Sequence, residues 1–216
     1  MKTERIERVR AALRAQGLTQ MIVCDPKSVW YLTGVAVEPY ERLLALYLPI
    51  EGEPVLFLNR LFNVPNPPCK AVWHTDTDAP VAQIAATVDA EKPLGIDKEW
   101  PAKFLIPLME AHPAMKVVLA SDCVDDCRAC KDAEEQSLMR EASRINDEVN
   151  EAAKHYVKIG MTEREVAEFI DAQYRAHGCE GPSFTTIVSF GANAADPHHE
   201  PDDTVLKEGD CILFDM

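Results

Sequence analysis

Apolar residues along the first part of the chain occur in short runs that alternate with stretches of helical spacing. Ile6, Val9 and Leu13 recur three and four positions apart before Gly17, which predicts an amphipathic opening helix. Runs of strand-forming residues predict β-strands at 20–24, 43–48, 55–58, 71–73, 94–96 and 116–120. Helical patterns predict helices at 81–88 and 102–111. Strands alternating with helices indicate an α/β domain over residues 1–124.

The pattern changes after a short junction at residues 125–130. Residues 131–158 contain neither Gly nor Pro, and apolar residues recur at helical spacing between positions 138 and 149, so one face of a long helix is expected to be covered. Thr162 and Glu165 have the spacing of a capping box, which predicts the start of a second helix. Two strands are expected at 184–190 and 211–215. We therefore predict a second, α+β domain over residues 131–216.

The segment WYLTG, residues 30–34, combines two aromatic residues with Leu and Thr and ends in Gly34. Aromatic and β-branched residues favour strands. The composition of this segment predicts a strand that packs in the core.

Composition and charge narrow the classes of function. The 216 residues include 36 acidic and 22 basic side chains, a formal net charge of −14, which argues against nucleic acid or an anionic membrane as the main partner. The longest apolar run, residues 43–50, is too short to span a bilayer, and the charged N-terminus lacks the apolar segment of a signal peptide. Seven scattered cysteines without a secretory signal indicate reduced thiols. These features predict a soluble, cytoplasmic protein.

Asp215 is the first candidate for chemistry, because it ends the apolar strand expected at 211–215. Asp is disfavoured in strands, and burial of an unpaired carboxylate is costly. A divalent metal ion would offset that cost, since hard cations bind carboxylate oxygens. The alternative is an exposed Asp beside a frayed chain end.

The adjacent pair His198 and His199 is the second candidate. Neighbouring side chains in extended backbone point to opposite faces, so the two imidazoles are not expected to serve one site together. One would enter a cleft while the other faces solvent. The alternative is an inert histidine pair on a polar surface loop.

Cys127 and Cys130 form a CxxC pattern, with Cys123 close by. A redox function would need thiols with a lowered pKa within a thioredoxin-like βαβ unit, and a zinc site would need a fourth ligand that is not nearby. We interpret these cysteines as structural, with a redox protein as an alternative. The remaining histidines match no metal-ligand pattern and are expected at the surface: His74, His112, His155 and His177.

Four segments, in their order along the chain, resemble the creatinase/aminopeptidase P/prolidase family of metallopeptidases. They are WYLTG, GID at residues 95–97, KDAEEQSLMREASRINDE, and the stretch PSFTTIVSFGANAADPHHEPDDTVLKEGDCILFDM. The resemblance implies a creatinase-type N-terminal α/β domain over residues 1–124, then an incomplete α+β catalytic domain of the pita-bread fold over residues 131–216.

The resemblance assigns roles to two residues. Asp215 matches the first metal-ligating Asp of the family, which binds one ion of a dinuclear pair, and His198 matches the histidine that contacts substrate and stabilises the tetrahedral intermediate. The interval between them is the one found in the family. The implied cofactors are two divalent metal ions, manganese first, with cobalt or zinc as alternatives.

An intact site in this family also needs a second Asp, a metal-binding His and two Glu, which do not follow in this sequence. We therefore expect residues 1–216 to be an N-terminal fragment that is inactive by itself. For the intact protein the resemblance implies a homodimeric exopeptidase that cleaves Xaa-Pro bonds of small proline-containing peptides. The alternative is a non-catalytic peptide-binding or assembly protein derived from the same fold.

Overall fold

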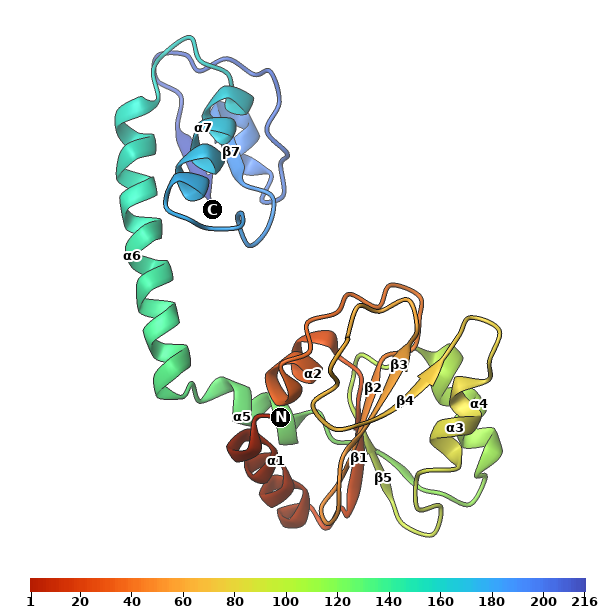
Figure 1. The fold of residues 1–216 in the computed structure, drawn as a ribbon. Coiled ribbons are helices and arrows are strands. Elements are labelled where there is room, and N and C mark those ends of the chain that lie inside the picture. Colours follow the sequence, from red (N-terminus) through yellow and green to blue (C-terminus); the bar gives the residue numbers. More distant parts are fainter. The chain divides into compact units, whose positions relative to one another are not determined.

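The computed structural model describes all of residues 1–216, which divide into two compact units, Met1–Lys131 and Asp132–Met216 (Figure 1). None of the helices has both the length and the apolar character needed to cross a membrane.

A mixed sheet of six strands forms the centre of the first unit, in the order β4-β3-β2-β1-β5-β6. β1 is antiparallel to β2 and parallel to β5. Its strands are β1 (Gln20–Val23), β2 (Ala45–Pro49), β3 (Val55–Asn59), β4 (Lys70–His74), β5 (Leu94–Ile96) and β6 (Val117–Leu119). All six were predicted from the apolar runs, with ends that differ by at most two residues.

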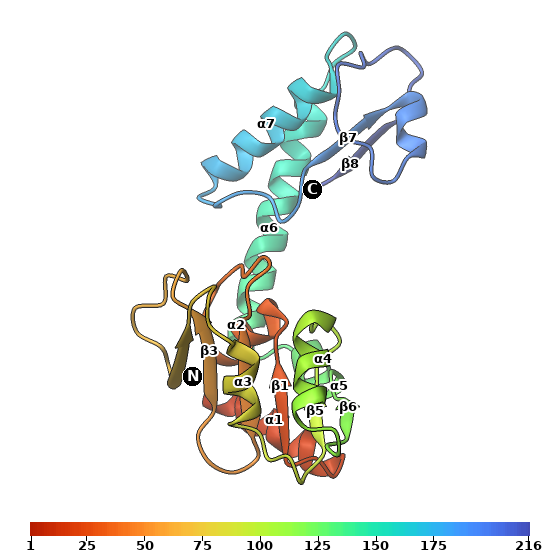
Figure 2. The ribbon, with the colours of Figure 1, turned by 90° about the vertical axis from the view of Figure 1, so that its right-hand side faces the viewer.

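Helices cover both faces of this sheet (Figures 1 and 2). On one face lie α1 (Thr3–Ala15), α2 (Pro26–Thr33) and α5 (Asp122–Ala129), and on the other lie α3 (Pro80–Ala85) and α4 (Ala102–Ala111). Neighbouring residues of β1 alternate between the two cores: Met21 packs with α1 and α2, whereas Ile22 packs with α3 and α4. The period of two along a strand therefore produces two separate hydrophobic cores.

The predicted strand at WYLTG is wrong, because these residues belong to helix α2 and its C-cap. Asp25 accepts hydrogen bonds from the backbone N–H groups of Lys27 and Ser28, and Pro26 occupies the first turn. Gly34 ends the helix with a φ of 79°, a left-handed conformation that glycine adopts without strain. The capping residues outweigh the strand preference of the aromatic side chains.

The residues expected to form a junction, 125–130, lie almost entirely within helix α5 of the first unit. Cys123, Val124 and Cys127 are buried against α1 and α2. The carbonyl of Cys127 accepts hydrogen bonds from Arg8 Nη2 (2.9 Å) and from the hydroxyl of Tyr31 (3.1 Å). These contacts extend the first unit beyond residue 124.

The second unit contains two helices and a two-stranded antiparallel sheet (Figure 2). Its elements are α6 (Ala133–Tyr156), α7 (Glu163–Ala176), β7 (Ile187–Phe190), the 3-10 helix η1 (Gly191–Ala195) and β8 (Ile212–Asp215). The predicted capping box of Thr162 and Glu165 is confirmed, and Asp132 forms a second one with Glu135 at the start of α6. Val149, Ala153, Val166, Ile170 and Phe190 form most of its core.

Helix α6 is covered over only part of the predicted apolar face. Val149 and Ala153 are fully buried against α7 and β7. Leu138 and Met139, nearer the start of the helix, are 64% and 56% exposed. The expectation of one continuous covered face is therefore wrong for the first half of α6, where no element of the same unit packs.

Candidate functional site

Asp215 is the last residue of β8 and pairs with Ile187 of β7. Its side chain is exposed, which agrees with the alternative of an exposed Asp and not with that of a buried carboxylate. The strand itself lies at the edge of the two-stranded sheet, and its residues are exposed or half-buried. The role of Asp215 as a metal ligand stays a prediction that rests on the family resemblance.

His198 and His199 lie after η1, and they differ in environment. We name residues 191–202, which include η1, the His198 loop. The His198 side chain is exposed, while its backbone N–H donates to Asp196 Oδ1 at 3.0 Å. The His199 side chain is only 16% exposed, and its Nε2 lies 2.7 Å from Glu163 Oε2. The His199 imidazole therefore faces inward and the His198 imidazole faces solvent.

Glu163, the first residue of α7, is the buried centre of this region. Its side chain has no exposed surface, and its two oxygens accept four hydrogen bonds. Oε1 accepts from the backbone N–H of Phe190 (2.7 Å) and from Asn193 Nδ2 (3.0 Å). Oε2 accepts from His199 Nε2 and from the backbone N–H of Asp202 (3.1 Å). Four donors satisfy the carboxylate, which makes its burial tolerable.

Glu163, His199 and Asp202 also have the composition of a metal site, since one ligand atom from each lies within 4.8 Å of the others. Four N–H donors already use both oxygens of Glu163. A cation would have to displace at least one of them, so this cluster fits a hydrogen-bonded anchor better than a metal centre. Sequence analysis missed Glu163, because a Glu in the first turn of a helix is ordinarily an exposed capping residue.

The hydrogen bond to Glu163 raises the pKa of His199 above its ordinary value, and Asp202 and Asp196 add to the effect. A raised folded-state pKa stabilises the fold below the unfolded pKa of about 6.5, and this contribution is lost as pH rises through the folded value. We expect the urea concentration at which the second unit unfolds to be lower at pH 8 than at pH 6. Loss of hydrogen-exchange protection at the amides of Val188 and Ile170 reports this unfolding. A His199→Gln variant should lack this difference, and an unchanged difference would contradict the assignment.

Two of the three cysteines expected to be structural, Cys123 and Cys127, belong to α5 and are buried, whereas Cys130 at the C-cap of this helix is exposed. Burial raises the pKa of the Cys123 thiol to about 11 and also raises that of Cys127. Redox-active cysteines need the opposite shift, because the thiolate is the reactive form. The geometry therefore supports the structural interpretation over the redox alternative.

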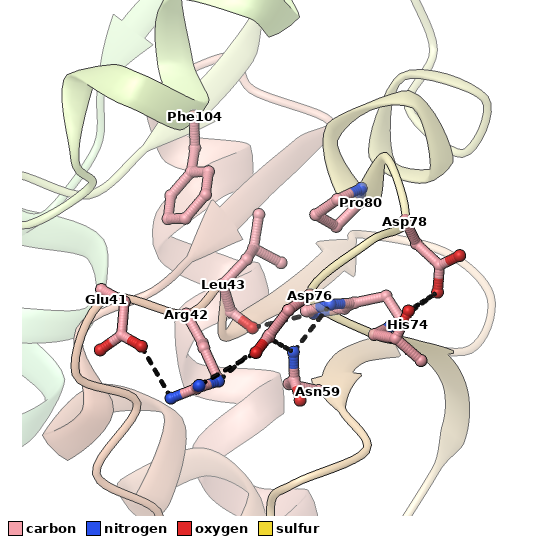
Figure 3. A pocket seen from close by; sticks show the side chains of 10 residues that line it. Glu41, Arg42, Leu43, Asn59, His74, Asp76, Asp78, Pro80 and Phe104 are labelled. Atoms are coloured by element: carbon pink, nitrogen blue, oxygen red, sulfur yellow. Dashed lines mark hydrogen bonds and ion pairs between the residues drawn. The ribbon is translucent and has the colours of Figure 1, made fainter.

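A hollow of about 410 Å³ opens in the first unit between β4, α3 and α4, and polar side chains line it (Figure 3). Arg42 donates from Nε and Nη2 to the two oxygens of Asp76, both at 3.0 Å, and Asn59 Nδ2 donates to Asp76 at 2.8 Å. Asp78 accepts from the backbone and the hydroxyl of Thr75. These polar groups therefore bind one another along one side of the hollow.

His74 forms the floor of this hollow and is fully buried, so the expectation of a surface histidine is wrong. Its Nε2 lies 3.1 Å from the carbonyl oxygen of Leu43, which can only accept. Nε2 therefore carries the proton, and Nδ1 faces Asn59 Nδ2 at 3.4 Å. His74 therefore joins β4 to the segment before β2 in a structural role.

Comparisons with known proteins cover nearly the whole chain. Residues 5–130 match the Creatinase/Prolidase N-terminal domain, and residues 137–216 match Metallopeptidase family M24. An uncharacterized peptidase of Staphylococcus epidermidis is 29% identical over 216 residues, which cover 98% of this chain and 61% of that protein.

Solved structures give the same result. The dipeptidase PepE from Mycobacterium ulcerans superposes with a TM-score of 0.88 and 28% identity, over 99% of this chain and 59% of that one. A prolidase from Thermococcus sibiricus superposes with a TM-score of 0.88 and 25% identity, over 99% of this chain and 60% of that one. The chain therefore spans less than two thirds of the length of each of these relatives.

Proposed function

Because the chain belongs to the creatinase/prolidase family, with a creatinase-type N-terminal domain followed by the start of a metallopeptidase family M24 domain, we propose that it is part of a metal-dependent exopeptidase that cleaves Xaa-Pro bonds of small peptides. The similarity to a dipeptidase and a prolidase over 99% of this chain carries the proposal. An Xaa-Pro bond suits a dedicated enzyme, because proline lacks an N–H and restricts φ.

Two residues of this chain have roles in the proposed reaction. When bound, two divalent metal ions, manganese first and cobalt or zinc as alternatives, supply an acidified water and polarise the scissile carbonyl. Asp215 would hold one ion through its exposed carboxylate. His198, with its exposed imidazole, would contact the substrate and donate a hydrogen bond to the developing oxyanion.

Residues 1–216 contain only one of the ligands that the resemblance assigns, and one carboxylate cannot hold two ions. We propose that these residues alone do not hydrolyse Xaa-Pro peptides. The first test is to sequence the coding DNA beyond codon 216 in its source. If the chain is part of a metal-dependent exopeptidase, codons for an Asp, a His and then two Glu should follow in that order. A stop codon directly after Met216 would overturn the exopeptidase function and favour the non-catalytic peptide-binding or assembly alternative.

The longer product, supplied with Mn²⁺, is expected to hydrolyse Ala-Pro and to leave Ala-Ala largely uncleaved. Replacing His198 with alanine should lower kcat by a factor of about 10²–10³, the loss typical of one oxyanion donor. Replacement of the exposed Glu200 with alanine is the matched control and should leave kcat unchanged. Equal cleavage of Ala-Pro and Ala-Ala would contradict the specificity, and an unaffected His198→Ala variant would contradict the role of that residue.

The partners we propose are small proline-containing peptides and a second copy of the same chain in a cytoplasmic homodimer. Neither nucleic acid nor a membrane is proposed, since the net charge is −14. Light scattering of the purified chain is expected to give twice its mass of 24.1 kDa. A concentration-independent monomer would contradict a dimer formed through the residues of this chain.

A further inference from the structure

We propose that Glu163 is a positioning residue, whose buried carboxylate holds the His198 loop in its folded shape without a metal ion. The importance of this loop for catalysis rests on the proposed function, because that function assigns substrate contact to His198. The shape of the loop and its dependence on Glu163 do not rest on it.

The four donors that Glu163 binds are spread over the whole loop region. Phe190 lies at the end of β7, Asn193 in η1, His199 beside His198, and Asp202 at the end of the loop. One carboxylate therefore fixes the segment at four points along its length. Between these points the backbone N–H of His198 is bound to Asp196 Oδ1, which leaves little freedom for the segment that carries the imidazole.

Contacts in the reverse direction complete the attachment of the loop to helix α7. The backbone N–H of Arg164 donates to the carbonyl of Asp202, and that of Glu163 donates to the carbonyl of Thr204, both at 3.1 Å. These N–H groups belong to the first turn of α7, where a helix leaves its donors without partners of its own. The backbone carbonyls of Asp202 and Thr204 therefore cap these two N–H groups. The positive end of the helix dipole also stabilises the Glu163 carboxylate.

His199 connects this anchor to His198. Because a carboxylate only accepts, Nε2 of His199 must carry the proton in its 2.7 Å hydrogen bond to Glu163. Asn193 Nδ2, which donates to Glu163 Oε1, also lies 3.1 Å from Thr204 Oγ1. With the inward imidazole fixed by Glu163, the adjacent His198 is directed outward, where its side chain is exposed.

The test compares Glu163→Gln with Glu168→Gln in the full 216-residue chain. Both variants remove one negative charge from α7, but Glu168 is exposed and no hydrogen bond joins it to the loop. In Glu163→Gln the new side-chain amide would present an NH₂ group to N–H donors, so two of the four contacts are lost. We expect amide hydrogen exchange over residues 191–202 to accelerate roughly 30-fold or more, while Ile170 and Val149 remain protected. Glu168→Gln should match the parent chain.

Imidazole NMR gives a readout that a merely structural role would not change. In the parent chain the Nε2 proton of His199 should be detectable, and the pKa of the His199 imidazole should be raised. In Glu163→Gln, the proton signal and the pKa should both become those of an exposed histidine. If Glu163→Gln does not fold, His199→Ala removes one of the four contacts and should accelerate exchange near residues 196–202 while residues 190–193 stay protected.

Three results would overturn the proposal. The loop could exchange at the same rate in a folded Glu163→Gln variant as in the parent chain, or His199→Ala could make the entire second unit lose protection together. Stoichiometric Mn²⁺ could also broaden the His199 resonances, which would make the cluster a metal site. None of these measurements depends on substrate, so failure here leaves the proposed peptidase function standing, and an inactive longer product leaves the loop result standing.

Discussion

Replacing Asp97 with alanine is expected to lower the free energy of unfolding of the first unit by about 3 kcal/mol. Asp97 follows β5, is only 6% exposed, and accepts hydrogen bonds from three backbone N–H groups and one thiol. The N–H groups belong to Cys24, Asp25 and Glu99. Alanine would leave these donors without their acceptor at the point where β1 ends and α2 begins, and an unsatisfied buried donor is costly.

Urea unfolding followed by tryptophan fluorescence measures this loss directly, because Trp30, Trp73 and Trp100 all lie in the first unit. The matched control is Glu99→Ala, two positions away, where the exposed side chain is removed and the backbone N–H is kept. We expect the control to lie within about 0.5 kcal/mol of the parent chain. An Asp97→Ala variant as stable as the control would show that water replaces the carboxylate.

Replacing Phe190 with alanine is expected to unfold the second unit selectively. Phe190 is 1% exposed and is the largest fully buried side chain of that unit's core. Truncation of a buried Phe typically costs about 3–5 kcal/mol, through lost transfer free energy and the cavity left behind. The second unit contains few buried apolar residues to absorb such a loss. We expect far-UV circular dichroism to lose the signal of this unit while the tryptophan fluorescence of the first unit stays native.

Phe184→Ala is the control for this substitution, because Phe184 lies in the same unit and is 47% exposed. Its removal should change the unfolding transition by less than about 1 kcal/mol. If Phe190→Ala unfolded both units together, the division at Lys131 and Asp132 would not correspond to independent cooperative units.

The GID segment has a physical explanation in the first unit. A Cβ placed on Gly95 would lie 2.9 Å from Cβ of Ala120 and 3.0 Å from Cβ of Met21, so only glycine fits between β1 and the end of β6. Asp97 accepts hydrogen bonds from the backbone N–H groups of Cys24 and Asp25, which directly follow β1. Packing and capping of the first unit therefore account for Gly95 and Asp97 of this segment.

Features that depend on neighbours in the chain could be predicted from the residues alone. Apolar runs bounded by Pro, Gly and Asn located every strand of the first unit, since the period of two and the turn residues are local signals. The start of α7 followed from Thr162 and Glu165, whose reciprocal hydrogen bonds span three residues. The candidates His198 and Asp215 also came from the sequence, through the family resemblance, and their roles stay predictions.

Features in which distant residues meet depend on the tertiary structure. Helix α2 is not one of them, because its caps, Asp25 and Gly34, are local signals that outweigh the strand preference of its aromatic side chains. His74 is buried, and its Nε2–H donates a hydrogen bond to the carbonyl oxygen of Leu43, far away in the chain. Glu163 reads in the sequence as one more acidic residue at a helix start, and becomes an anchor only where Phe190, Asn193, His199 and Asp202 fold against it. A buried polar group is specified by its partners, and those partners are set by the fold and not by the spacing of residues along the chain.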